Sequence, residues 1–378
     1  MKFKINRDHF SAGLQLVSNV VGARKTMPIL QNVLIEAKAD MIHLTTTNLD
    51  LGVRCSVKAN VTGEGSITLP VKDLSKIVRE LADMEVCVES NDSSKSTIST
   101  RGSVFNLIGL DSKEFPPLPE LEKHKNIKIS RDEIGQMLKS VSYAQSINEE
   151  RYMLKGVFFL FEKEKISLVA TDGRRLAVAN KNLSDEEEIE GEFILPSLTV
   201  TELEKLPKTG EDINLSFTDR QVSFELKVNN NDNAETGFVG SIYLISKVVE
   251  GKYPNYKQVI PKDDFRQAII ERELMQECVS RAALVSDERI TLRIKENEME
   301  ISGKSLLGDA CESLPISYKG EESTVSFNPK FLLDPLRAIQ TDQISLEFRD
   351  DMSPGVFKVN TEKGNPSILC VVMPIRTD

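Results

Sequence analysis

The chain has 378 residues, of which 40% are hydrophobic and 28% charged, and its formal net charge at pH 7 is −10. This length exceeds one ordinary hydrophobic core and predicts two or three domains. No apolar run approaches the roughly 18 residues that a membrane-spanning helix needs. The first residues have no apolar segment like that of a signal peptide, so we expect a soluble, cytoplasmic protein.

The sequence predicts neither a metal site nor a cofactor. Residues 229–233 loosely resemble a calcium loop but lack its glycine and its acidic register. Nucleophile elbow, P-loop and dinucleotide motifs are absent, and we expect no catalytic residues. No two cysteines form a C-x-x-C pair, and we expect each to be a small core residue; they are Cys55, Cys87, Cys278, Cys311 and Cys370.

The sequence contains three copies of one structural unit. Residues 5–8, INRD, recur 124 positions later as ISRD at 129–132, and an apolar spacing of three to four follows each copy. This spacing predicts a helix. A fainter third copy has Leu274, Cys278 and Ala282 at that spacing, with Val279 placed 138 residues after Val141.

A second marker supports three copies of about 126 residues. The runs ITLP at 67–70, FILP at 193–196 and VSFNP at 325–329 each precede another helical pattern. A proline there suits the first turn of a helix. Alternating segments between the helices predict antiparallel strands. We therefore expect an α+β fold of three repeated domains, 1–122, 126–252 and 253–378, each with two helices on antiparallel sheets.

The acidic net charge would normally argue against nucleic acid as a partner, but charge distribution matters more than the sum. The balance is +1 for residues 1–125, −5 for 126–261 and −6 for 262–378. Lys72, Lys76 and Arg79 share one face of their predicted helix, and Lys330 and Arg337 share the matching face of theirs. A charged outer face is ordinary for one helix. Two matched basic faces favour a shared anionic partner, which we expect to be DNA.

Residues 171–176, TDGRRL, lie between two predicted strands and form a hairpin turn by their Asp-Gly pair. Taken alone, Arg174 and Arg175 are read as surface charges. A hairpin does not require them.

The whole chain resembles the bacterial β sliding clamp family, the processivity subunits of the replicative DNA polymerase. The resemblance rests on the threefold unit and on five segments: RYML at 151–154, TDGRRLAV at 171–178, GKYPNY at 251–256, RAA at 281–283 and VVMPIR at 371–376. It implies a head-to-tail homodimer that closes a ring around duplex DNA and has no catalytic activity. A clamp loader opens such a ring, and polymerases and repair proteins dock by short peptides.

The resemblance places the peptide groove between the second and third domains. Its expected residues are Leu154, Thr171, Gly173, Arg174, Arg175, Leu176, Pro254, Val259, Val371, Val372, Met373, Pro374, Ile375 and Arg376. Gln258, Ile375 and Asp378 depart from the family pattern, so we expect them to alter which peptides bind best.

The resemblance also assigns contacts to DNA and to a second subunit. The DNA positions are Arg24, Asn148, Tyr152 and Met153, added to the basic helix faces. The subunit interface is expected at Phe105, Leu284 and Val285, which could otherwise be ordinary core residues.

Two other functions remain open from the sequence. A monomeric peptide-binding hub would use the groove without encircling DNA. A nucleotidyl-transfer enzyme would need paired carboxylates at metal-binding spacing, and none is recognised.

Overall fold

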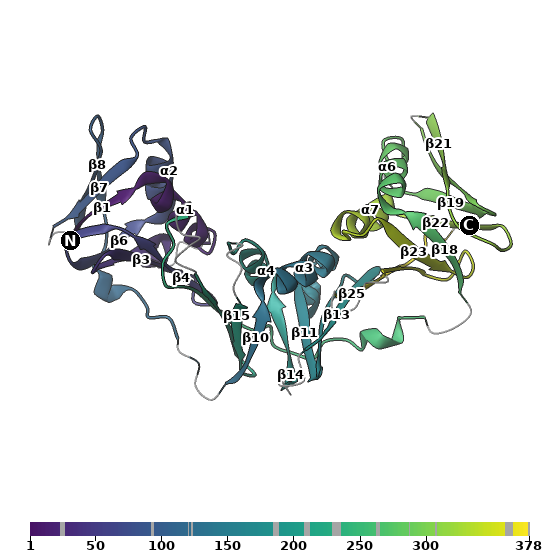
Figure 1. Ribbon diagram of the computed structural model, residues 1–378, viewed down its shortest axis with the longest axis horizontal. Helices are drawn as coiled ribbons and strands as arrows, with labels where there is room; N and C mark the ends of the chain where they lie inside the picture. Colours follow the sequence, from purple (N-terminus) through teal and green to yellow (C-terminus); the bar gives the residue numbers. More distant parts are fainter. Residues whose placement is uncertain are drawn as a thin grey trace. The chain divides into compact units, whose positions relative to one another are not determined.

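The computed structural model describes residues 1–22, 27–91, 94–119, 121, 124–183, 189–207, 212–228, 236–261, 265–286, 288–306, 308–359 and 366–376. In these residues the strands form four antiparallel sheets, with helices packed on them (Figure 1). The chain separates into two compact units. The first unit holds Met1–Ile134 and Leu198–Val248, and the second holds Gly135–Ser197 and Val249–Asp378.

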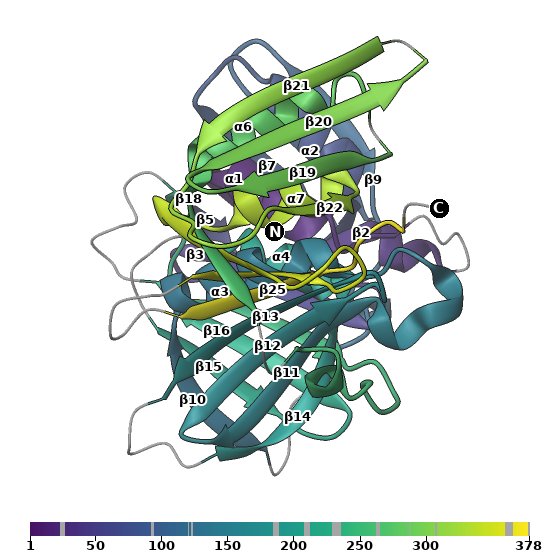
Figure 2. The ribbon, with the colours of Figure 1, turned by 90° about the vertical axis from the view of Figure 1, so that its right-hand side faces the viewer.

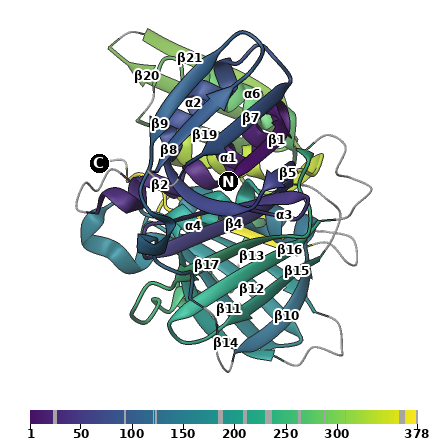
Figure 3. The same cartoon turned by 90° about the vertical axis from the view of Figure 1, so that its left-hand side faces the viewer.

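The first unit contains a five-stranded and an eight-stranded sheet (Figure 3). The smaller has the order β5 (Asn60–Gly63), β1 (Lys2–Asn6), β7 (Glu85–Ser90), β8 (Lys95–Ser99), β9 (Val104–Ile108). The larger has the order β10 (Lys125–Ser130), β15 (Asp212–Phe217), β16 (Gln221–Lys227), β17 (Ser241–Lys247), β4 (Leu51–Lys58), β3 (Met41–Thr47), β2 (Asn32–Lys38), β6 (Gly65–Pro70).

The second unit has an eight-stranded and a four-stranded sheet (Figure 2). The larger has the order β14 (Ile189–Pro196), β11 (Gly156–Lys163), β12 (Lys165–Thr171), β13 (Arg175–Asn182), β25 (Ser367–Val372), β24 (Gly355–Val359), β23 (Gln343–Phe348), β18 (Arg266–Glu271). The smaller has the order β21 (Gly308–Pro315), β20 (Glu298–Ser305), β19 (Ile290–Lys295), β22 (Ser323–Phe327).

The two eight-stranded sheets follow the same plan. β4 pairs with β17 so that Gly52 faces Ile245, and β13 pairs with β25 so that Leu176 faces Val371. Gly52 and Leu176 are 124 residues apart, the offset of the sequence repeat. Each of these sheets therefore joins strands from two successive repeats.

Helices lie where apolar spacing predicted them. They are α1 (Arg7–Ser18), α2 (Val71–Glu80), α3 (Arg131–Val141), α4 (Ser197–Glu204), α6 (Arg272–Ala282) and α7 (Pro329–Ala338). Short 3-10 turns are η1 (Pro28–Gln31), η2 (Ser112–Glu114), η3 (Ser142–Ala144), η4 (Glu149–Leu154) and η5 (Tyr256–Gln258). α1 packs on α2, and α6 packs on α7. No helix of the described residues is long and apolar enough to span a membrane.

One arginine in each repeat ties its two helices together. Arg7, Arg131 and Arg272 are the first residues of α1, α3 and α6. Arg7 donates to the carbonyl of Leu81 (2.8 Å), and Arg272 donates to those of Leu336 (3.1 Å) and Thr341 (2.8 Å). Arg131 donates to the carbonyls of Glu204, Leu206 and Pro207. These carbonyls lie in the last turns of α2, α4 and α7 or in the residues just after them. The C-terminal end of a helix leaves acceptors unpaired and favours a cation.

These arginines correct the expected register of the third repeat. Residues 270–273, IERE, are the third copy of INRD, because Arg272 takes the role of Arg7. In α6 the buried residues include Met275 rather than Leu274. The alignment of Val279 with Val141 was thus wrong by three residues.

The prediction that every cysteine lies in the core is wrong for two of them. Cys55, Cys278 and Cys370 are buried, Cys87 is half-buried and Cys311 is exposed on β21. β21 is an edge strand, and its pattern is mostly exposed.

Candidate functional site

The predicted turn between β12 and β13 is confirmed, and its own side chains hold it. The carboxylate Oδ1 of Asp172 accepts from the amides of Arg174 (2.9 Å) and Arg175 (3.1 Å). The hydroxyl of Thr171 accepts from the Gly173 amide (3.1 Å) and donates to the Arg175 carbonyl (2.6 Å). Gly173 has φ +87°, which favours glycine. Aspartate caps turns in this way because its short side chain reaches amides two residues on.

The two adjacent arginines have opposite surroundings. Arg174 is exposed, as a surface charge would be, whereas the Arg175 side chain is only 7% exposed. Its guanidinium donates to Asp172 Oδ2 (3.1 Å), Asp334 Oδ2 (2.6 Å) and the Tyr143 carbonyl (2.6 Å). A buried guanidinium needs such partners, because removing a charge from water is costly. The interpretation of Arg175 as a surface charge is therefore wrong.

An apolar cluster covers one face of the second unit's large sheet. Leu176, Val178 and Val371 point to the same face because alternate strand residues do so. The stretch after β17 covers them: the Tyr253 ring stacks on Phe158 with centroids 4.7 Å apart, and Tyr256 meets Phe158 edge-on. The cluster consists of Leu154, Phe158, Val169, Leu176, Val178, Ile194, Tyr253, Tyr256, Val356 and Val371.

Exposed apolar side chains lie close in sequence to members of this cluster. Val259 is 53% exposed and Met373 46% exposed, and Pro254 is also exposed. The Met373 amide donates to the Arg174 carbonyl (3.0 Å), so the chain after β25 runs beside the turn. Further along, the Ile375 amide donates to the Ser326 carbonyl (2.8 Å).

The predicted groove residues thus fall into three groups. Leu154, Leu176 and Val371 belong to the cluster, which we call the groove cluster. Val372 is also buried but alternates with Val371, so its side chain takes the other face of β25. The remaining ones lie in the turn, after Tyr253 or after β25: Thr171, Gly173, Arg174, Arg175, Pro254, Val259, Met373, Pro374, Ile375 and Arg376. Asp378 lies outside the described residues.

A buried polar pair lies on the other side of β25. The Tyr143 hydroxyl and the Cys370 sulfur are 2.9 Å apart. Burial raises the pKa of the Tyr143 hydroxyl well above its usual value and that of the Cys370 thiol to about 11. Both groups therefore stay protonated at neutral pH.

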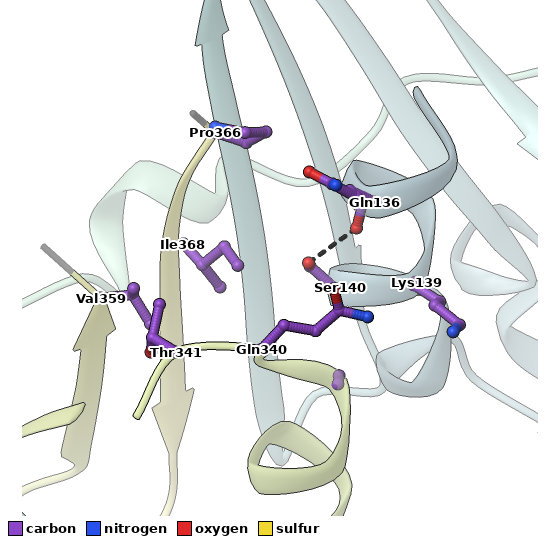
Figure 4. Close-up of a pocket in the computed structure, with 9 residues that line it drawn as sticks. Gln136, Lys139, Ser140, Gln340, Thr341, Val359, Pro366 and Ile368 are labelled. Atoms are coloured by element: carbon purple, nitrogen blue, oxygen red, sulfur yellow. Dashed lines mark hydrogen bonds between the residues drawn. The ribbon is translucent and has the colours of Figure 1, made fainter. Parts of the chain in front are cut away.

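A cavity of about 210 Å³ lies elsewhere in the second unit and was not foreseen (Figure 4). α3, the end of α7 and strands β24 and β25 surround it. The lining residues are Gln136, Lys139, Ser140, Ala338, Gln340, Thr341, Val359, Pro366 and Ile368. None of them belongs to the predicted groove. Its walls come from segments about 200 residues apart, so no local pattern could have indicated it.

The basic helix faces predicted for DNA are exposed within their units. Lys72, Lys76 and Arg79 are exposed on α2, opposite its buried Leu74 and Val78. Lys330 and Arg337 are likewise exposed on α7. Arg24 lies outside the described residues.

The other predicted DNA contacts lie around η4. Asn148 is exposed and caps η4 by accepting from the Glu150 amide (2.9 Å). Tyr152 is exposed, while Met153 packs against the groove cluster. Met153 therefore borders the predicted groove as well.

The predicted interface residues are not ordinary core. Phe105 is 39% exposed on β9, the edge strand of its sheet, and Leu284 is 81% exposed just beyond α6. Val285 is half-buried. Val104 and Ile108, also exposed on β9, extend this apolar edge. Apolar edge strands of this kind invite pairing with another chain.

Comparison with known proteins covers almost the whole chain. Profiles of the DNA polymerase III beta subunit match residues 1–119 (N-terminal domain), 128–255 (central domain) and 257–376 (C-terminal domain). The chain belongs to the DNA polymerase III beta subunit family. Its members are the bacterial sliding clamps, and the family is one of processivity factors rather than catalytic subunits.

Individual sliding clamps are similar to this chain over their full length. The beta sliding clamp of Synechocystis is 31% identical over 405 residues, covering 100% of this chain and 99% of its own. The Bacillus subtilis clamp structure has a TM-score of 0.87 at 27% sequence identity to this chain. The structure of a Bartonella birtlesii clamp bound to griselimycin has a TM-score of 0.87 at 29% identity. Both comparisons cover 100% of each chain. The predicted fold of three clamp domains is thereby confirmed.

Proposed function

We propose that this sliding clamp closes a ring around duplex DNA as a head-to-tail homodimer and tethers the replicative polymerase and repair proteins to it. Partner proteins, including a clamp loader, dock by short peptides in a groove between the second and third predicted domains. The clamp itself supplies no catalytic group, and we place it in the cytoplasm with its DNA. The domain limits of 1–122, 126–252 and 253–378 are part of this proposal.

The groove cluster with its exposed apolar border is the observation that carries the docking proposal. Val259 and Met373 expose apolar surface on segments that are held in place by hydrogen bonds to Tyr256 and Arg174. A preformed apolar surface lowers the cost of ordering a bound peptide. Methionine adapts to ligands of different shape, and the exposed Arg174 supplies a polar contact at the edge.

Truncation of the C-terminus tests the groove. A peptide selected from a random library for binding to the clamp should lose binding when residues 373–378 are deleted, because Met373, Pro374, Ile375 and Arg376 go with them. Met373→Ala alone should weaken binding about tenfold, as expected for one buried apolar contact. Fluorescence polarisation measures both.

Met352→Ala is the matched control, because Met352 is also an exposed methionine of the second unit. It should leave the affinity unchanged. Equal peptide affinity in the truncated and full-length proteins would refute the groove, and a dimer lost on truncation would show a different role for this segment.

Exposed apolar edges support the dimer. Phe105 on β9 and Leu284 beyond α6 lie on different units, so pairing them between subunits is a head-to-tail contact. Phe105→Asp with Leu284→Asp should give a monomer of 42.3 kDa by sedimentation. A wild-type protein that sediments as a monomer at micromolar concentration would instead favour the monomeric hub.

A further inference from the structure

A chain of contacts runs from α7 to the turn beside the groove. Asp334, on α7, binds Arg175 Nη1 at 2.6 Å, and its side chain is 18% exposed. Phe331, one helical turn earlier on α7, lies under the same guanidinium, 4.7 Å from the Arg175 Cζ to the ring centroid. Tyr143 holds the guanidinium through its carbonyl and its ring. α7 therefore fixes Arg175 by charge and by stacking together.

Arg175 helps to hold the turn in place, because two of the turn's hydrogen bonds involve Asp172, which the Arg175 side chain also binds. One oxygen of Asp172 accepts from Arg175 Nε (3.1 Å) and the other accepts from the amides of Arg174 and Arg175. The Arg174 carbonyl in turn accepts from the Met373 amide. The turn and the segment after β25 thus both depend on where Arg175 lies, although the three nitrogens of its guanidinium are bound inside the protein.

We infer that Asp334 is a positioning residue for peptide docking, acting through Arg175 on the turn 171–174 and the segment after β25. This inference rests on the proposed function, because it assumes that the groove takes a peptide. Asp334 itself is no member of the predicted groove. A purely structural role would affect the stability of the fold but would leave the affinity of the folded protein unchanged.

Asp334→Asn is the informative change, since it keeps the shape of the side chain and removes its charge. We expect about tenfold weaker binding of the library-selected peptide, the order of one charge-assisted hydrogen bond. Asp334→Glu, which restores the charge, should recover most of the affinity. Asp351→Asn is the control: Asp351 is an exposed aspartate of the same unit, and the change in net charge is the same.

A double-mutant cycle separates action through Arg175 from any other effect. In an Arg175→Met background, Asp334→Asn should cost no further affinity, because residues that act through one contact are not additive. Native-state hydrogen exchange adds a readout that needs no peptide. The amides of Arg174 and Arg175 should exchange faster in Asp334→Asn, while those in the middle of β12 should not.

The outcomes distinguish this inference from the proposed function. Asp334→Asn with wild-type affinity, or with an equal loss in the Arg175→Met background, would overturn the inference and leave the groove intact. If no peptide is selected on the wild-type protein, the docking proposal fails, and the exchange of the two turn amides still decides whether Asp334 holds the turn.

Discussion

At the scale of single residues, Arg174 and Arg175 show what sequence could and could not predict. The turn was predictable, because Asp172 and Gly173 are local signals for it. The difference between the two arginines was not. Arg175 is buried because Asp334, 159 residues later, pairs with it, and no local pattern reports such a partner. The resemblance places both arginines in the groove, but in the structure the Arg175 side chain is buried and Arg174 is exposed.

The arginines that tie the helix pairs together should stabilise the fold. Arg131→Met removes hydrogen bonds to three carbonyls and should lower the free energy of unfolding by about 3 kcal/mol. Lys139→Met, an exposed position on the same helix, is the control. Urea unfolding measures both, and equal midpoints for the two variants would show that the arginine contacts contribute nothing.

Thiol labelling tests the environment of Cys370. Its burial and its pKa of about 11 keep the thiol protonated and covered at pH 8. Iodoacetamide should therefore leave Cys370 unmodified in the folded protein and modify it in urea, as read by mass spectrometry. Labelling at the same rate in both conditions would contradict the buried Tyr143 contact.

At the scale of elements, periodicity located the helices but not all of the strands. The repeat marker at residues 5–8 and 129–132 predicts the helix that follows it but not β1 and β10, the strands that run into it. The third copy was misaligned because IERE has lost the Asn or Ser that precedes the arginine in the other copies. The pairing of β4 with β17 joins segments almost 200 residues apart, beyond any local signal.

The first unit contains a counterpart of the groove region with different side chains. Gly52 stands where Leu176 stands in the second unit, and a Cβ there would lie 2.3 Å from Leu118 Cδ2. Leu118 thus covers Gly52 of β4. Arg54, bonded to the Thr45 hydroxyl (3.1 Å), takes the place of Val178 by the same offset. The counterpart is therefore more polar than the groove cluster, and the cavity of about 600 Å³ beside it has Arg54, Glu225 and Tyr243 among its lining residues.

This difference predicts one peptide site on each chain. Isothermal titration of the selected peptide should give one peptide per clamp subunit and none after deletion of residues 373–378. A second site of similar affinity that survives the deletion would contradict the comparison of the two units.

The basic face of α2 should contribute to DNA contact. Lys72→Gln with Lys76→Gln removes two exposed charges and should lower the slope of log affinity against log salt by about two if each lysine neutralises one phosphate. The binding of a short duplex over a salt series measures this. An unchanged slope would remove α2 from the DNA interface.

At the scale of the whole molecule, net charge was a poor predictor of DNA as a partner. A chain of net −10 would be a weak non-specific DNA binder if contacts alone held it. A closed ring needs only weak contacts, because topology prevents its release. The family was predictable because its motifs are spread over the whole chain, whereas ring closure depends on a second copy that no single-chain sequence pattern describes.

We propose that a ring of two subunits is linked to DNA by topology. The clamp is assembled on nicked circular plasmid with a bacterial clamp loader and ATP, separated from free protein by gel filtration, and then treated with a restriction enzyme that cuts the plasmid once. We predict that the clamp stays with the circle and leaves when the circle is cut. Equal retention on circular and linear DNA would contradict a topological link.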